Sequence, residues 1–416
     1  MDELIGYILL GLVSYRFITK LGKSLPVLEL MLLLAVLQWY IGPLNSYSAD
    51  VARNKYSMYV SSEIYFSYIT PALVVFILVI FQAKPLEFSI GNDQLTSSNK
   101  LSKYIVIVGL LVGVVRPFVP PSLLFVFFIL DGLKYVGVSM LLFSSERKDK
   151  YWFWFVVGLL VFQAFSSGMF HGLLLWGLFL FMYWCLRFKP TMIFKVSIIM
   201  AGIFLSIGIQ LIKSDFRAII WKGGFEGNKF GLAMDILQGN LSETNFEDDS
   251  DKEELNARLN QGWIISAIMY HTPQNEPFAR GSTINEAISA SLLPRFLAPN
   301  KKKAGGRDNF MRYTGLLLGE TTSMGLSIVG EAYANFGVDG GILFMGIWAL
   351  FLIWYWNRLL HFIRKNKVLV FFIPVIFLQV VKAETELVVV LNHLVKSTIL
   401  VAVLFWGARK FLKWDI

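Results

Sequence analysis

The sequence predicts an all-α, polytopic membrane protein with about eleven transmembrane helices and one large extracytoplasmic helical loop before the last three. Composition is the first indication: 56% of the residues are hydrophobic and only 16% are charged, whereas soluble proteins carry about 25% charged residues. The second is a series of apolar segments of roughly the length that crosses a bilayer, about 17–25 residues. The third is the placement of Lys and Arg in the short segments between them.

Each predicted helix is bounded by charges or helix breakers, such as the run `KLGKSLP` after the first and `FVPPS` after the fourth. The acidic N-terminus lacks the features of a cleaved secretory signal, so the first apolar segment is expected to be a retained helix. The eleven segments lie at about 4–20, 25–43, 66–83, 102–118, 121–144, 152–169, 171–187, 192–212, 338–358, 368–383 and 388–407.

The orientation follows from the basic residues. Seventeen Lys and Arg residues fall in one set of alternate short segments, and at most four fall in the other. Because cytoplasmic loops carry the excess of Lys and Arg, the first set is expected in the cytoplasm. This predicts a multi-pass protein of a cell membrane with its N-terminus outside and its C-terminus in the cytoplasm.

Three parts are therefore expected: a bundle of about eight helices at 1–212, an extracytoplasmic segment at 213–337 and three helices at 338–416. The middle segment is too polar to lie in the membrane throughout. Its runs 259–270 and 283–297 have helical apolar periodicity and are expected to be amphipathic helices on the membrane face. The acidic run 242–254 is expected to lack regular structure.

Several function classes are disfavoured. The net charge of +9 is explained by the topology, so no nucleic-acid partner is expected. A single cysteine, Cys185, excludes an intramolecular disulfide and a thiolate metal cluster. No His, Asp or Glu spacing resembles a metal site, and no glycine-rich phosphate loop follows a strand. We therefore expect no metal and no cofactor.

Arginines are the main candidates for binding, because the guanidinium group recognises phosphate oxygens in a bidentate manner. Arg295, between Pro294 and an apolar run, is favoured for function, whereas Lys301, Lys302 and Lys303 are better explained as solvated charge or adhesion to anionic lipids. The candidate diphosphate-binding arginines are Arg217, Arg258, Arg280, Arg295, Arg307 and Arg312.

Glu331, Tyr333 and Asn335 precede the ninth predicted membrane helix, and the first and last of them share a helical face. Tyr333 and Asn335 are candidate substrate contacts. Glu331, Glu320 and His271 are candidate general bases toward a hydroxyl. Helix packing through the nearby glycines and a surface role for His271 are the alternatives.

Charges near the predicted membrane helices give two further expectations. Asp131 and Lys134 are one turn apart and are expected to form a structural ion pair. The run `KAETE`, residues 382–386, is expected to face a cavity under the extracytoplasmic segment.

Several motifs together resemble the bacterial oligosaccharide repeat-unit polymerases, the Wzy-type O-antigen and exopolysaccharide polymerases. The resemblance covers the whole plan of helices and loop, although Ala298 stands where that family often has Trp. It is carried by `RLNQGW`, `LLPRFLAPNKK`, `RYTG`, `SSGMFHGLLLWG` and `TTSMGLSIVGEAYANFG`.

The resemblance implies a metal-independent glycosyltransferase of the bacterial inner membrane. The donor would be a glycan on undecaprenyl diphosphate, and the acceptor a sugar hydroxyl of a new lipid-linked repeat unit. Membrane lipids, a flippase and a chain-length regulator of the same pathway would be its partners. Two alternatives stay open: an O-antigen ligase, which uses the same donor, and a polysaccharide or lipid transporter, which would show repeated halves that the sequence lacks.

Overall fold

The computed structural model is helical throughout the part of the chain that it describes, with no strand there. It describes residues 1–48, 56–86, 99–144, 146, 148–223, 225, 227–243, 256, 259–292, 306–320 and 322–412. The acidic run expected to lack regular structure lies almost entirely outside these residues.

All eleven segments predicted to cross the membrane contain helix. Eight helices in the described residues are long and apolar enough to span a bilayer, which indicates a multi-pass α-helical membrane protein. They are Val27–Ser48, Ser62–Ile80, Leu101–Phe118, Leu124–Leu141, His171–Phe188, Met192–Lys213, Ile328–Lys365 and Leu387–Phe411. The other three predicted segments correspond to α1 (Asp2–Lys20), α9 (Asp149–Ser167) and the shorter apolar helix Lys367–Phe377.

The chain folds into two compact units. Unit 1 comprises Met1–Phe17, Val27–Pro85 and Asn256–Ile416, and unit 2 comprises Ile18–Pro26 and Leu86–Leu255. This division differs from the three consecutive segments expected from the sequence. Much of the segment 213–337 packs with the first and last helices of the chain instead of standing apart.

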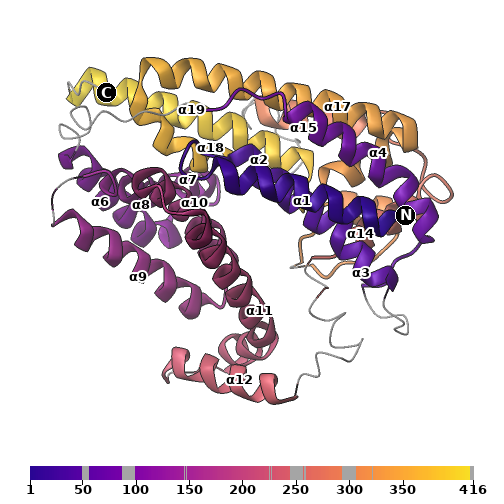
Figure 1. Ribbon diagram of the computed structural model, residues 1–416, viewed down its shortest axis with the longest axis horizontal. Helices are drawn as coiled ribbons and strands as arrows, with labels where there is room; N and C mark the ends of the chain where they lie inside the picture. Colours follow the sequence, from indigo (N-terminus) through magenta and orange to yellow (C-terminus); the bar gives the residue numbers. More distant parts are fainter. Residues whose placement is uncertain are drawn as a thin grey trace. The chain divides into compact units, whose positions relative to one another are not determined.

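In unit 1, α4 runs beside α17 and α15 beside α19 (Figure 1). The start of α1 and the end of α19 lie toward opposite ends of this unit. Its elements are α1, α2 (Val27–Val36), the π-helix η1 (Leu37–Ile41), α3 (Gly42–Ser48), α4 (Ser62–Ile80), α14 (Gly262–His271), α15 (Ser282–Leu292), α16 (Arg307–Thr314), α17 (Ile328–Lys365), the 3₁₀ helix η3 (Lys367–Phe372), α18 (Ile373–Phe377) and α19 (Leu387–Leu412).

The expectation for 259–270 is wrong in one respect. The run forms α14, but residues 262–269 are all buried within unit 1, so α14 is not an amphipathic helix on the membrane face. The reason is that `GWIISAIM` is apolar or small on every side, and such a helix is stable when protein surrounds it. In contrast, α15 has one buried face, with Ala287 and Ala290, and exposes Ile288 and Leu292.

The helix α17 changes direction at Gly337, which has left-handed, non-helical dihedral angles (φ 69°, ψ −156°). Glycine tolerates this conformation because it has no Cβ. The break separates a stretch that is buried from Ile328 to Asn335 from the long helix that the sequence predicts to enter the membrane at 338. Residues Glu331, Tyr333 and Asn335 therefore lie on a short helix of their own.

Unit 2 has its tightest pairing between α6 and α8. The predicted ion pair in this region is confirmed, since Lys134 Nζ lies 2.6 Å from Asp131 Oδ1. Its elements are α6 (Asn99–Val115), the 3₁₀ helix η2 (Arg116–Phe118), α7 (Leu124–Asp131), α8 (Leu133–Leu141), α9 (Asp149–Ser167), α10 (His171–Phe188), α11 (Met192–Gly223) and α12 (Lys229–Glu243).

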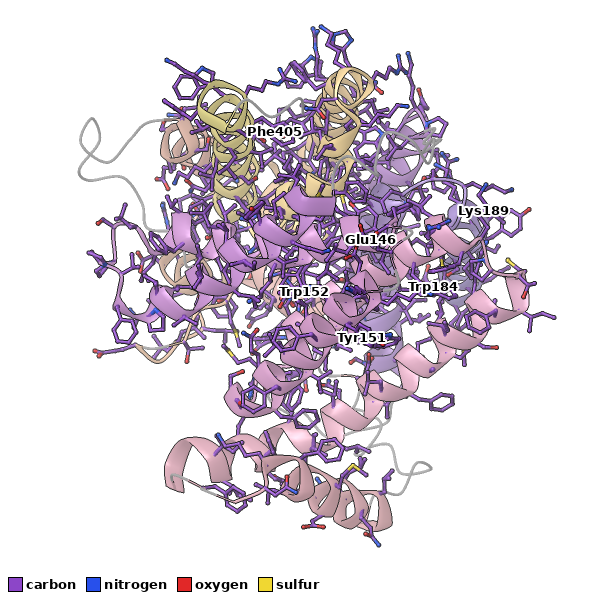
Figure 2. All side chains as sticks on the ribbon, turned by 90° about the vertical axis from the view of Figure 1, so that its left-hand side faces the viewer. Glu146, Tyr151, Trp152, Trp184, Lys189 and Phe405 are labelled. Atoms are coloured by element: carbon purple, nitrogen blue, oxygen red, sulfur yellow. The ribbon has the colours of Figure 1, made fainter. Side chains whose placement is uncertain are left out.

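Aromatic side chains gather at the ends of unit 2 helices that the sequence places in the cytoplasm. Tyr151 and Trp152 lie in the first turn of α9, and Trp184 lies near the end of α10, close to Lys189 (Figure 2). The Trp184 ring stacks on Phe194 with 5.5 Å between centroids. Rings next to basic residues are typical of the membrane–water interface.

Candidate functional site

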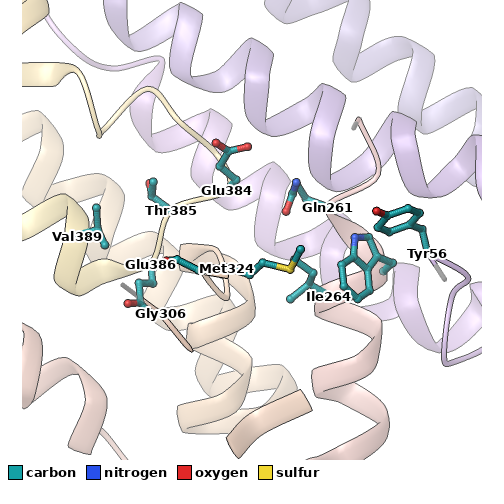
Figure 3. A pocket seen from close by; sticks show the side chains of 12 residues that line it. Tyr56, Gln261, Ile264, Gly306, Met324, Glu384, Thr385, Glu386 and Val389 are labelled. Carbon is teal, nitrogen blue, oxygen red and sulfur yellow. The ribbon is translucent and has the colours of Figure 1, made fainter. Parts of the chain in front are cut away.

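Unit 1 contains a cavity of about 400 Å³ that is lined by both polar and apolar side chains (Figure 3). Its wall includes residues 384–386 of the 378–386 loop, Gln261 with the first turn of α14, and the segment 323–325. The side chains that give it chemical character are Tyr56, Gln261, Trp263, Glu384, Thr385 and Glu386. The expected cavity beside residues 382–386 is therefore present, with its acidic residues on the wall.

The 378–386 loop is held by hydrogen bonds at several points. The Trp39 indole donates to the Ala383 carbonyl at 3.0 Å. The Thr385 hydroxyl lies 3.1 Å from the Gln379 carbonyl and 2.9 Å from the Lys382 carbonyl. These bonds close the loop on itself and fix the carboxylates that follow.

The two cavity carboxylates have different surroundings. Glu386 is buried, and its Oε2 lies 3.5 Å from Asn309 Nδ2, within reach of a hydrogen bond from that amide. Glu384 is partly exposed and lies on the Gln261 side of the cavity in Figure 3. At Gly325, an added Cβ would lie 2.8 Å from the Glu384 carbonyl oxygen. The backbone of the 323–325 segment therefore lies so close to the loop that only glycine fits at position 325.

The wall that carries Gln261 and Trp263 is fixed by Asn260. Its Oδ1 accepts from the Trp263 backbone N–H at 3.1 Å, and its Nδ2 donates to the Ser46 hydroxyl at 2.7 Å. The Gln261 N–H donates to the Gln38 carbonyl, which belongs to the π-helical stretch η1. Single π-helical turns inside α-helices are frequent at functional sites. Here the π turn supplies the Gln38 carbonyl, which accepts the hydrogen bond that holds Gln261 in the cavity wall.

Glu331 lies outside this cavity wall and is fully engaged inside the protein. Its Oε1 accepts from the Thr283 hydroxyl at 2.7 Å, and its Oε2 accepts from the backbone N–H of Leu387 at 2.8 Å. Because Leu387 is the first residue of α19, the carboxylate also lies at the positive end of that helix. Glu331 joins α15, α17 and α19.

Asn335 belongs to the same network, which confirms that it shares a helical face with Glu331. Its Nδ2 donates to the Thr283 hydroxyl and to the Glu331 carbonyl, both at 2.8 Å. Its Oδ1 accepts from the Gly281 N–H at 2.9 Å, within a turn where Arg280 has a positive φ of 48°. Asn335 therefore holds the turn on which Arg280 is exposed.

Tyr333 is buried in an aromatic group instead of facing the cavity. Its ring packs edge-on against Tyr68 at 5.2 Å and Phe278 at 6.1 Å. This placement gives Tyr333 a packing role between α4 and the segment before α15.

His271 and Arg312 are brought into one cluster at the contact of α14 with α16. Arg312 Nε donates to Glu276 Oε1 at 2.6 Å, and the Glu276 N–H lies 3.4 Å from the His271 carbonyl. The hydrogen bond to Glu276 raises the pKa of Arg312 further above its usual range. His271 Nδ1 lies 3.3 Å from Asn275 Nδ2. The cluster is a partly exposed surface with one positive and one negative side chain.

The other predicted residues are separate from this cluster. Arg307 Nη2 donates to the Leu318 carbonyl at 3.1 Å, and Glu320 is exposed in the loop that Arg307 supports. Arg217 belongs to unit 2, where its Nε donates to the Gly168 carbonyl at 2.8 Å. Arg258 and Arg295 lie outside the described residues.

Sequence reasoning missed Tyr56, Gln261 and Trp263 as a group. Tyr56 packs edge-on against Trp263 at 5.5 Å, although more than 200 residues separate them in the chain. The `KAETE` run gave a local signal, because charges at the end of an apolar segment are unusual. The motif `RLNQGW`, which contains Gln261 and Trp263, gave a signal only through the family resemblance.

No known protein family, no curated protein sequence and no solved structure matches this chain. Within the described ranges, no three His, Cys, Asp or Glu side chains are placed to hold a metal ion together.

Proposed function

We propose that the chain is a glycosyltransferase of the repeat-unit polymerase type, held in the bacterial inner membrane by about eleven helices. It would transfer a growing glycan from undecaprenyl diphosphate to a sugar hydroxyl of a new lipid-linked repeat unit on the outer face. The observation that carries this proposal is the cavity, where two carboxylates, an amide and two aromatic rings meet beside the first turn of α19.

The cavity suits a sugar acceptor. Its volume of about 400 Å³ lies within the range of about 300–1,000 Å³ common for small-ligand pockets. Trp263 and Tyr56 offer apolar ring surface, which matches the C–H faces of a sugar. The Gln261 amide and the two carboxylates offer donors and acceptors for its hydroxyl rim.

Glu384 is the preferred general base in this proposal. An attacking hydroxyl must lose a proton as the new glycosidic bond forms, and a positioned carboxylate can accept it. Glu384 is partly exposed on the cavity wall, whereas Glu331 is buried with hydrogen bonds to both oxygens. Glu320 and His271 lie elsewhere in unit 1 and do not line the cavity.

The leaving group, undecaprenyl diphosphate, would be stabilised by arginines of the segment 256–320. Arg280 and Arg312 are both exposed there, and Arg307 directly follows Gly306 of the cavity wall. Charge developing on the diphosphate oxygens is stabilised most by preorganised cationic donors.

The experiment is complementation of a bacterial strain that lacks the gene, followed by analysis of its lipid-linked glycans. Glu384→Gln, expressed at the wild-type level, should lower the rate about 100–10,000-fold, the usual contribution of general acid–base catalysis, and single repeat units should accumulate. The control is Asp308→Asn, which changes an exposed carboxylate of α16 and should leave chain length unchanged.

Wild-type chain length in the Glu384→Gln strain would remove this residue as the base. The gene deletion itself tests the function. Long lipid-linked chains would indicate a ligase, and repeat units confined to the cytoplasmic leaflet would indicate a transporter.

A further inference from the structure

The helix α12 of unit 2 has an apolar stripe that the protein covers only in part. Phe230, Met234 and Leu241 are 56%, 49% and 47% exposed. They are four and seven residues apart, so they lie on one side of the helix. Asp235 is exposed on a different side, about 100° further round the helix than Met234. Ala233 lies on the other side of the stripe from Asp235 and is buried in a cluster with Phe216 and Phe170.

The position of α12 along the membrane normal can be worked out from its neighbours. Its companion α11 has 32 residues, about 48 Å, whereas the hydrocarbon core is about 30 Å thick. Only 6% of the apolar window within Met192–Lys213 is buried by protein, so this part of α11 faces lipid. The last turns of α11 extend beyond that span.

The turn between α9 and α10 marks the membrane surface, because α10 is a candidate span that begins at His171. Two hydrogen bonds connect this turn to the α11–α12 hairpin. Arg217 Nε donates to the Gly168 carbonyl at 2.8 Å, and Lys229 Nζ donates to the Ser166 carbonyl at 3.2 Å. The start of α12 is therefore level with the surface.

From that level α12 packs against α11. Asn240 Nδ2 donates to the Leu211 carbonyl at 2.5 Å and to Asp215 Oδ2 at 3.0 Å. Leu237 Cδ1 lies 3.8 Å from the place where a Cβ on Gly208 would stand. Leu211 and Gly208 belong to the candidate span. The end of α12 thus lies at least as deep as its beginning.

We propose that α12 is an interfacial helix whose stripe of Phe230, Met234 and Leu241 contacts the acyl chains of the bilayer. An apolar stripe at this depth would otherwise be exposed to water, whereas amphipathic helices bury such stripes at the boundary of headgroups and acyl chains. By the orientation of the basic loops, this is the leaflet that faces away from the cytoplasm.

The test uses the full chain in lipid vesicles with an environment-sensitive fluorophore on one cysteine. Cys185→Ala provides the background, since Cys185 is the only cysteine and is buried. Met234→Cys carries the probe, and Asp235→Cys, the next residue, is the matched control. Phe204→Cys, exposed within the α11 span, shows that the protein is inserted.

The Met234 label should emit at shorter wavelength than the Asp235 label and lose fluorescence with nitroxide-labelled lipids, as the Phe204 label does. The Asp235 label should be quenched by aqueous iodide. Iodide quenching of both α12 labels would overturn the proposal. Protection of the Met234 label from both quenchers would also overturn it, because a protein surface would then cover the stripe.

Discussion

At the scale of single residues, the polar network around Thr283 shows how much local sequence can reveal. The spacing of Glu331 and Asn335 predicts that they share a helical face, and both bond to one hydroxyl. The hydroxyl comes from Thr283, 48 residues before Glu331. Helical periodicity cannot indicate such a partner, since its position depends on how distant helices pack.

Thr283→Val should destabilise unit 1. Valine has the shape of threonine but removes the group that donates to Glu331 and accepts from Asn335. A buried group that loses its hydrogen bond costs about 1–3 kcal/mol. Thermal unfolding of the purified protein in detergent should occur at a lower temperature. Asn285→Ala, on the exposed side of α15, is the control. Equal melting temperatures for the two variants would mean that the network contributes little.

Arg312→Lys should impair turnover while preserving the charge. Lysine lacks the planar fork that binds two phosphate oxygens at once. It also cannot reproduce the bond from Nε to Glu276 that orients this side chain. Loss of one preorganised donor typically costs about 100–1,000-fold in rate. The measurement is the glycan chain length in the complemented deletion strain. The control is Arg364→Lys, which changes an exposed arginine of α17. Unchanged chain length would exclude Arg312 from diphosphate binding.

At the scale of elements, hydropathy identified the eight helices that are long and apolar enough to span a bilayer, but not the ends that matter for the site. The ninth predicted helix was expected from 338, yet α17 begins at Ile328. The nine residues before Gly337 are helical because Ser327 caps them and Thr283 binds their polar face. Their burial comes from tertiary contacts, so a window of hydropathy does not detect it.

The pairing of α6 with α8 makes a prediction at this scale. A Cβ on Gly109 would lie 2.3 Å from the backbone nitrogen of Lys134, which cannot move without shifting α8. Gly109→Ala should therefore lower the melting temperature, since overpacking costs about 1–3 kcal/mol. Gly158→Ala in α9 meets no atom within 4 Å and should leave stability unchanged or slightly higher. The same melting temperature for both variants would contradict the close approach of these helices.

At the scale of the whole molecule, the sequence predicts the class of protein better than its organisation. Composition and segment length indicate an α-helical membrane protein, and the structure agrees. The grouping of Asn256 onward with residues 27–85 was not expected. It rests on contacts such as that of the Tyr68 hydroxyl with the Val329 carbonyl at 2.7 Å, which joins residues 261 apart. Charge and hydropathy patterns are local, so they do not contain this information.

Topology is the prediction on which the placement of the cavity depends. Eleven spans would put the two ends of the chain on opposite sides of the membrane. Because basic residues concentrate in one set of short segments, the N-terminus is expected outside. Alkaline phosphatase, which is active only after export, should be active when fused after Lys252. A fluorescent protein that folds only in the cytoplasm should fluoresce when fused at the C-terminus, with a fusion after Lys189 as the matched cytoplasmic control. A cytoplasmic result at Lys252 would place the cavity away from the outer face, where the proposed lipid-linked acceptor is displayed, and would remove the basis for the transferase proposal.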